Sequence, residues 1–430
     1  MAFTVVSQPL ELQPVHNKLN FIVEDGDYYA ETDFKYVFKT YVEATLVDTS
    51  KLYPNLSSRA HYDASPVIRD YISRQVIIPL NATTSLLARA SNYEICTYKV
   101  EFWAEYTDSN GDFQSVQRNA GTNLVAWNGV APYHSATNMT TFTASLVYAA
   151  GSKKNYLNWK YNGWTSTEAF SDYAIPLKET DYRSVSFMAK TTANVINVHQ
   201  LLVYTQTKTG TNKSLIKNLA ISSSTDETHR IYHAGIGVPQ LNATSWTSTS
   251  IPAGYTATIS STEDDYIAVV LRRYNGSSYD IVTNALLFKL QPITCYQFDH
   301  YTVAYQAPLG GIGYINFSKR SDIKQKNTQD TYKNILAYNY ALGDRETLVH
   351  HNRKQESITL MTDWIRDQTQ VTEIMDMMSS PWIMLVDNDY NLIPATVKST
   401  DIERRKKKQD KMFTYSVEFE YAYDENTILR

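Results

Sequence analysis

Cysteine is almost absent from this chain of 430 residues, which contains only Cys96 and Cys295, nearly two hundred positions apart. So few and so distant cysteines exclude a disulfide framework and a cysteine-based metal site. We expect both thiols to be buried and to pack as small hydrophobic side chains.

Long hydrophobic runs are also missing, and no window approaches the roughly 18 apolar residues that a membrane-spanning helix needs. The opening Met1–Ser7 lacks the basic start and the apolar core of a secretory signal peptide. We therefore expect a protein that is made in a cytoplasm, stays soluble and has no membrane span.

Neither sign of charge dominates. The net charge is −4, with 20% charged and 43% hydrophobic residues, which excludes a disordered or collagen-like chain. The length predicts two or three domains. Tyrosine is the residue in excess, with 33 copies against 15 Gly and 13 Pro. Because Tyr, Thr, Val and Ile fit a pleated, half-buried surface, we predict a mainly β fold.

Residues 1–125 are predicted to form an N-terminal β-sandwich. Its clearest strands are Asn20–Val23, Phe34–Val42 and Tyr98–Tyr106, the last with nearly alternating apolar and charged residues. The Asn-Gly pair in Asp108–Asp112 predicts a tight hairpin after that strand. Ser65–Ile72 is predicted to form a short helix, with Ser65 as N-cap and proline next, that closes one end of the sandwich.

Residues 126–300 are predicted to form a second antiparallel β-sandwich or barrel, because short strands recur without helical periods between them. The strands that we expect are Val185–Met188, Val195–Tyr204, Tyr266–Arg272 and Asp280–Leu290. The segment Asn242–Thr262 is predicted to be a loop.

Residues 301–430 are predicted to form an α+β assembly module. A glycine-containing strand at Leu309–Phe317 is followed by a charged connector at Lys319–Thr331 and by a helix at Asp363–Met378, capped by Thr362. The predicted face of that helix consists of Trp364, Ile365, Val371, Ile374, Met375 and Met378. The expected strands that close the module are Trp382–Val386, Leu392–Val397 and Phe413–Tyr423.

The sequence contains few patterns that are typical of catalytic or metal-binding sites. His229 and His233 have a spacing of four that suits two ligands on a helix, but their surroundings predict a strand or loop. His350 and His351 are expected in a solvated turn. The glycines of Gly310–Gly313 are not followed by a helix, so we expect a bulge or a close backbone approach instead of a phosphate loop.

Paired carboxylates, such as Asp264 with Asp265 or Asp387 with Asp389, are predicted in turns, with nothing to indicate a glycosidase cleft. We therefore predict no catalytic residues, no metal site and no cofactor, and a protein that is not an enzyme.

The most concentrated charge is the basic run Arg404, Arg405, Lys406, Lys407 and Lys408. It predicts either contact with nucleic acid or an acidic neighbouring subunit, for example at a rim or lumen, or a solvated loop or edge strand. The second interpretation is favoured.

Three tryptophans lie in Asn-, Ser- and Gly-rich surroundings, namely Trp127, Trp159 and Trp164. Such residues stack on sugars, but polar and aromatic surfaces are also typical of permanent subunit interfaces. The interface is favoured, and glycan binding remains the alternative.

In several stretches the chain resembles tail and baseplate structural proteins of double-stranded DNA phages that infect Bacteroidetes, including crAss-like phages. These stretches are Gln8–Val23, Phe34–Val42, Tyr62–Ile72, Tyr98–Tyr106, Thr362–Met378 with Ser379–Pro381 after it, and Val417–Tyr423. They cover about two thirds of the chain and address the middle domain least.

The resemblance implies a virion structural protein that forms a ring or hub in the tail, neck or baseplate. Its implied partners are copies of itself, other tail or neck proteins such as portal-side rings, hub or fibres, and passing genomic DNA. Since closed rings use heterologous interfaces, we expect the first sandwich and the C-terminal module to provide them. We also expect a chain without Asp401–Arg430 to fold but not to assemble. The rivals are a receptor- or glycan-binding tail protein and a depolymerase.

Overall fold

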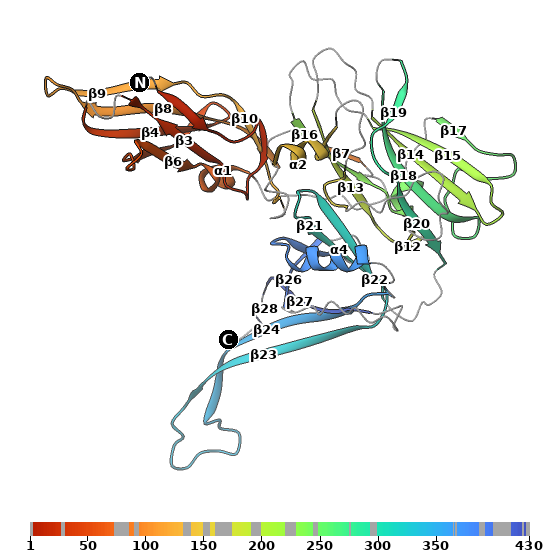
Figure 1. Cartoon of the computed structure of the whole chain (residues 1–430). Helices are drawn as coiled ribbons and strands as arrows, with labels where there is room; N and C mark the ends of the chain where they lie inside the picture. The colour runs from red at the N-terminus through yellow and green to blue at the C-terminus, as the bar shows by residue number, and fades with distance from the viewer. Residues whose placement is uncertain are drawn as a thin grey trace.

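The structure is a computed structural model in which strands dominate (Figure 1). It describes residues 3–26, 31–72, 86–89, 94–131, 139–148, 155–159, 174–190, 199–219, 229–243, 248–274, 277–292, 299–363, 365, 368–386, 392–398, 414–423 and 425–426.

The first part of the chain forms two sheets that pack face to face. One has the strand order β1–β3–β6, and the other has the order β2–β10–β8–β4–β5, with β9 beside β8. Their facing side chains, among them Phe21, Phe38 and Phe102, form one hydrophobic core. The strands span Thr4–Ser7 (β1), Leu12–Pro14 (β2), Asn20–Glu24 (β3), Thr32–Val42 (β4), Thr45–Leu52 (β5), Arg59–Asp63 (β6), Ile95–Thr107 (β8), Phe113–Asn119 (β9) and Leu124–Trp127 (β10).

Alternation along β8 determines its orientation, because Tyr98 and every second residue after it is buried as far as Ala104. The predicted hairpin follows, with Gly111 at a φ of 85°. Helix α1 (Ser65–Tyr71) closes the sandwich through buried Ile68. Its N-cap differs from the prediction: Ala64 is the cap, and the N–H of Ser65 donates to the preceding aspartate side chain.

The middle part contains a seven-stranded sheet of order β12–β20–β18–β14–β15–β17, with β19 beside β18, and a four-stranded sheet of order β11–β13–β16–β7. Its core includes Phe187, Val269 and Phe288. The elements span Leu86–Arg89 (β7), Met139–Leu146 (α2), Val147–Tyr148 (β11), Ile175–Lys178 (β12), Ser184–Lys190 (β13), His199–Thr207 (β14), Asn212–Leu219 (β15), His229–Gly235 (β16), Val238–Asn242 (α3), Ser248–Ser250 (β17), Asp264–Tyr274 (β18), Tyr279–Ile281 (β19) and Leu286–Gln291 (β20).

Three features of the middle part differ from the predicted pattern. Strand β7 comes from the first 125 residues and pairs with β16. The pairs β11–β13 and β12–β20 are parallel. The predicted strand Asp280–Leu290 is divided into the end of β19 and most of β20, because Thr283 turns inward and its Oγ1 accepts the N–H of Leu271 at 2.8 Å.

The C-terminal part is an eight-stranded sheet of order β22–β21–β25–β26–β27–β24–β23, with β28 beside β24. Helix α4 packs on it, and Phe317, Ile374 and Phe419 belong to the shared core. The elements span Tyr301–Gln306 (β21), Ile312–Phe317 (β22), Ser321–Lys333 (β23), Thr347–Met361 (β24), Gln368–Met378 (α4), Ile383–Val386 (β25), Leu392–Val397 (β26), Ser416–Tyr421 (β27) and Glu425–Asn426 (β28). The predicted fold class, mainly β with a C-terminal α+β part, is confirmed.

Helix α4 begins at Gln368 and not at Asp363. The predicted cap, Thr362, instead exchanges two hydrogen bonds of 2.9 Å with Tyr415, one from its own N–H and one to its Oγ1. These bonds extend the sheet and prevent the helix from starting there. Met375, predicted on the buried face, is 38% exposed, whereas Met377 is fully buried.

Two other predictions for this part are wrong. The supposed connector Lys319–Thr331 forms most of β23. Removal of Asp401–Arg430 would not leave a folded module, because β27 lies between β26 and β24 and its Val417 and Phe419 are fully buried. Trp364, which belongs to the first turn of the predicted helix, lies outside the described residues.

Candidate assembly surface

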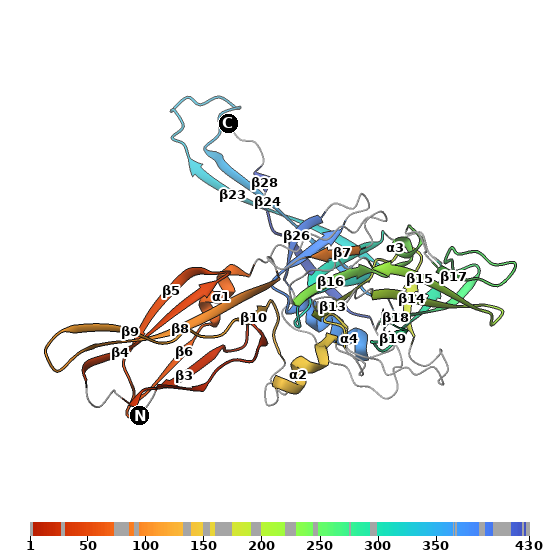
Figure 2. The same cartoon turned by 90° about the horizontal axis from the view of Figure 1, so that it is seen from above.

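Strands β23 and β24 form an arm that extends well beyond the body, as both views show (Figures 1 and 2). The strands pair antiparallel from Ser321 opposite Leu360 to Lys333 opposite Thr347. On its other edge, β24 pairs with β27 and then with β28 as far as Arg353. From there to the tip, the described residues contain no third strand beside the hairpin.

The outer strand of the arm, β23, is the exposed one. Every residue of β23 from Ile323 onward is exposed, and its outer edge has no strand partner in the described part of the chain. The tip, residues 334–346, contains four large exposed hydrophobic side chains: Ile335 (94%), Tyr338 (104%), Tyr340 (61%) and Leu342 (106%). The values near 100% for Ile335, Tyr338 and Leu342 mean that these three side chains touch almost nothing in their own chain.

Contacts along the arm are local. His351 lies opposite Asp330, with 4.0 Å between Nδ1 and the carboxylate, and Tyr332 meets His350 edge to face at 6.3 Å. His350 is the extra residue of a bulge in β24. The pair His350–His351 is therefore part of a strand and not of a solvated turn.

A two-stranded hairpin is only marginally stable in water by itself, and a long free edge is a template for pairing with another chain. Isolated apolar side chains on a surface need no explanation, but four within eight residues at a projecting tip do. The arm therefore has the properties of a surface that another chain covers.

The body that carries the arm is held together at the loop between β21 and β22. Gly310 and Gly311 have φ values of 86° and 123°. A Cβ on Gly310 would lie 2.5 Å from the carbonyl oxygen of Asn128, and one on Gly311 would lie 2.6 Å from the Cβ of Ser186. The glycine pattern thus marks a close backbone approach, as the sequence predicted.

A buried chain of hydrogen bonds crosses the same junction. The N–H of Ile312 donates to Ser186 Oγ at 3.1 Å, which lies 2.7 Å from Nδ1 of His233. Nε2 of His233 lies 2.8 Å from a carboxylate oxygen of Glu94. Serine, histidine and glutamate in a row suggest a nucleophile, but Ser186 is fully buried with its Oγ already engaged. The row connects all three parts of the chain.

Two of the three candidate tryptophans lie inside the protein. Trp127 is fully buried and its Nε1 donates to the carbonyl of Leu309 at 2.9 Å. Trp159 is 5% exposed, and its Nε1 donates to the carbonyl of Ser184 at 2.6 Å. Neither ring offers a face to a sugar or to a second subunit. Trp164 lies outside the described residues.

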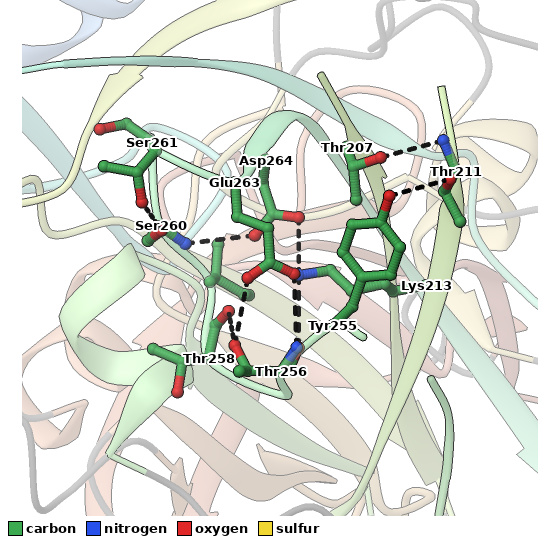
Figure 3. A network of polar contacts seen from close by, with 12 residues as sticks. Thr207, Thr211, Lys213, Tyr255, Thr256, Thr258, Ser260, Ser261, Glu263 and Asp264 are labelled. Carbon is green, nitrogen blue, oxygen red and sulfur yellow. Dashed lines mark hydrogen bonds and ion pairs between the residues drawn. The ribbon is translucent and has the colours of Figure 1, made fainter. Parts of the chain in front are cut away.

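The most buried charged cluster lies in the middle part (Figure 3). Lys213, fully buried, contacts Asp264 at 2.7 Å and Glu263 at 3.0 Å. Asp264 is also fully buried, and its Oδ2 accepts the N–H of Ser260 at 3.2 Å. Burial alone would raise the pKa of Glu263, but the hydrogen bond and charge of Lys213 outweigh it and lower that pKa.

This cluster corrects the prediction that Asp264 and Asp265 lie in a turn, because both begin β18. Its function is structural: it ties β15 to the start of β18. Asp387 and Asp389 lie outside the described residues.

A small cavity of about 60 Å³ separates the middle and C-terminal parts. Two ion pairs of its lining cross the boundary, Lys178 with Asp363 at 3.1 Å and Arg183 with Glu373 at 3.5 Å. The cavity is large enough for water and is part of the packing between the two parts.

The remaining candidates from the sequence are the histidine pair, the basic run and the two cysteines. His229 and His233 lie on strand β16, so their spacing does not give the geometry of a helical ligand pair. Within the described ranges, no group of three or more His, Cys, Asp or Glu residues is arranged to hold a metal. The basic residues Arg404, Arg405, Lys406, Lys407 and Lys408, and also Cys295, lie outside these ranges. Cys96 is buried as expected, which raises the pKa of its thiol to about 12.

Sequence reasoning missed the arm, whose strand β23 has eleven consecutive exposed residues. The available signal was a stretch from Ser321 to Lys333 without proline or glycine, ending in Thr-Tyr-Lys. None of the helices in the described residues is long and apolar enough to cross a membrane. No family model and no curated protein sequence matches the chain.

Proposed function

We propose that the chain is a non-enzymatic structural protein, a ring- or hub-forming subunit of a larger assembly, and that the β23–β24 arm makes its main contact. Following the sequence resemblance, the assembly is the tail, neck or baseplate of a phage particle. The observation that carries the proposal is the projecting arm, with an unpaired edge and an apolar tip.

The tip supplies energy of the right size for such a contact. Full burial of one large apolar side chain contributes about 1.5–3 kcal/mol, so four contribute roughly 6–12 kcal/mol. Association costs about 4–15 kcal/mol in lost translational and rotational freedom. The tip alone is therefore marginal, and stable binding needs the additional contacts of the arm's strands.

The partners that fit are further copies of this chain and neighbouring proteins of the same particle. Contact of the run Arg404–Lys408 with passing DNA stays a prediction. The glycan-binding alternative is less favoured, since Trp127 and Trp159, two of its three candidate aromatics, are buried.

The test replaces residues 334–346 with a two-residue Asn-Gly turn, which shortens the arm and leaves the body unchanged. We expect a folded protein that no longer forms higher assemblies in sedimentation velocity and electron microscopy. A matched control replaces Tyr53 and Leu56, which are 69% and 104% exposed on the first sandwich, with serine and should assemble normally.

Normal assembly of the chain without the tip would refute the proposed role of the arm. Loss of assembly in the control as well would show that any exposed apolar pair has this effect, and would equally count against the arm.

A further inference from the structure

The outer edge of β23 is regular over its whole length. The one irregularity of the hairpin, the bulge at His350, lies in β24, so β23 runs without interruption from Ser321 to Lys333. Backbone groups along this edge have no strand partner within the described residues. An uninterrupted edge of thirteen residues, eleven of them exposed, is well suited to the addition of another strand.

The sequence of β23 is complementary to itself. When two copies pair antiparallel with full overlap, Asn327 lies on the two-fold axis and residue numbers of opposed pairs sum to 654. Lys324 then faces Asp330 of the other copy, and this pair occurs twice. None of the thirteen opposed pairs brings like charges together.

Registers shifted by two residues keep every side chain on the same face of the sheet, and they can be distinguished from the fully overlapped register. A shift of two residues in one direction places Lys326 opposite its own copy and Asp322 opposite Asp330, which is unfavourable. A shift in the other direction places Lys326 opposite Asp330. Lys324 and Lys326 lie on the same face of the strand, so each can be tested without changing the strand's pattern.

We propose that two copies of this chain associate through their β23 edges, antiparallel and in the fully overlapped register, to form a four-stranded sheet of order β24–β23–β23–β24. The inference rests on the proposed assembly role of the arm and names its partner. The sheet would contain about a dozen new backbone hydrogen bonds. It would also supply the third and fourth strands that a lone hairpin lacks.

The same geometry gives the tip a place to bind. Because the strands are antiparallel, Lys333 at the end of one arm lies opposite Ser321 at the base of the other. Each apolar tip therefore reaches the C-terminal part of the partner. Such a two-fold contact closes on itself, so a ring would need a second, heterologous surface on the body.

Charge exchange tests the proposal on the full chain. Position 324 of each copy faces position 330 of the other. Lys324→Asp therefore opposes two acidic residues in both of these pairs, and Asp330→Lys opposes two basic ones. Each variant alone should dimerise roughly 10- to 100-fold more weakly than the native chain in sedimentation velocity. An equimolar mixture of the two should recover near-native affinity, because only the mixed dimer opposes acid to base.

Lys326→Asp is the matched control, the same exchange two residues away on the same face. In the proposed register Lys326 faces Thr328, so the control should dimerise almost as the native chain does. Failure of the mixture to recover affinity, or a loss in the control as large as in Lys324→Asp, would overturn the inference.

A native chain that stays monomeric at all concentrations would overturn it as well. The proposed function would survive if replacement of the tip still abolished assembly with other components. Circular dichroism confirms that the exposed substitutions leave the fold intact.

Discussion

The buried ion pair between Lys213 and Asp264 gives the sharpest prediction about stability. Both side chains are fully buried, 2.7 Å apart. Lys213→Met keeps most of the side-chain volume but leaves the carboxylate of Asp264 buried without its counter-charge. Removing one partner of such a pair costs about 3–5 kcal/mol. For a cooperative unit of 150–250 residues, this is a fall of about 6–20 °C in Tm.

The double variant Lys213→Met/Asp264→Asn should be more stable than the single one. Asparagine keeps an oxygen that accepts the N–H of Ser260, 3.2 Å from the native carboxylate, and removes the unpaired charge. Differential scanning calorimetry at pH 7 measures both variants against the native chain. A double variant that melts at or below the Tm of Lys213→Met would refute the reasoning, because the damage would then come from lost packing and not from a stranded charge.

Two further predictions concern the glycine junction and acid stability. Gly311→Ala should lower Tm more than Gly254→Ala: both have positive φ, but a Cβ would meet atoms within 3 Å only at Gly311, and equal losses would contradict the close approach. The lowered pKa of Glu263 means that its stabilising effect is present above pH 4.5 and is lost as pH falls through the folded-state pKa. The difference in Tm between the native chain and Glu263→Gln should therefore shrink on acidification, and a constant difference from pH 7 to 3 would contradict this.

The elements that the sequence predicted well have one solvent-exposed face and one buried face. Strand β26 spans the predicted Leu392–Val397, and β27 buries Val417 and Phe419 on the predicted side. Apolar and polar residues alternate along a strand only where one face of the strand is buried and the other is exposed to solvent. Strand β23 is exposed to solvent on both faces, so nothing in its hydrophobic pattern distinguishes it from the charged connector that we predicted.

Other features depend on residues that are far apart in the sequence. Glu94 and His233 are separated by 139 positions, and Trp127 binds a carbonyl 182 positions away. The polar composition around Trp127 suggested an exposed ring, at a subunit interface or on a sugar platform. The ring is buried instead, because neighbours along the chain do not determine what packs against a side chain in space. The start of α4 was misplaced for the same reason, since Thr362 is held by Tyr415 on a distant strand.

The arm is the best candidate for assembly because of where unpaired strand edges and exposed apolar side chains lie in the described chain. In the body, buried charges such as Lys213 and Arg183 are matched within the chain, and the glycine junction brings all three parts into direct contact. In the arm, a whole strand edge and four apolar side chains remain without partners. Exposed apolar side chains also occur on the first sandwich, such as Leu56 at 104%, but the arm combines four of them with a long unpaired strand edge. Because both features favour pairing with another chain, recognition is expected at the arm.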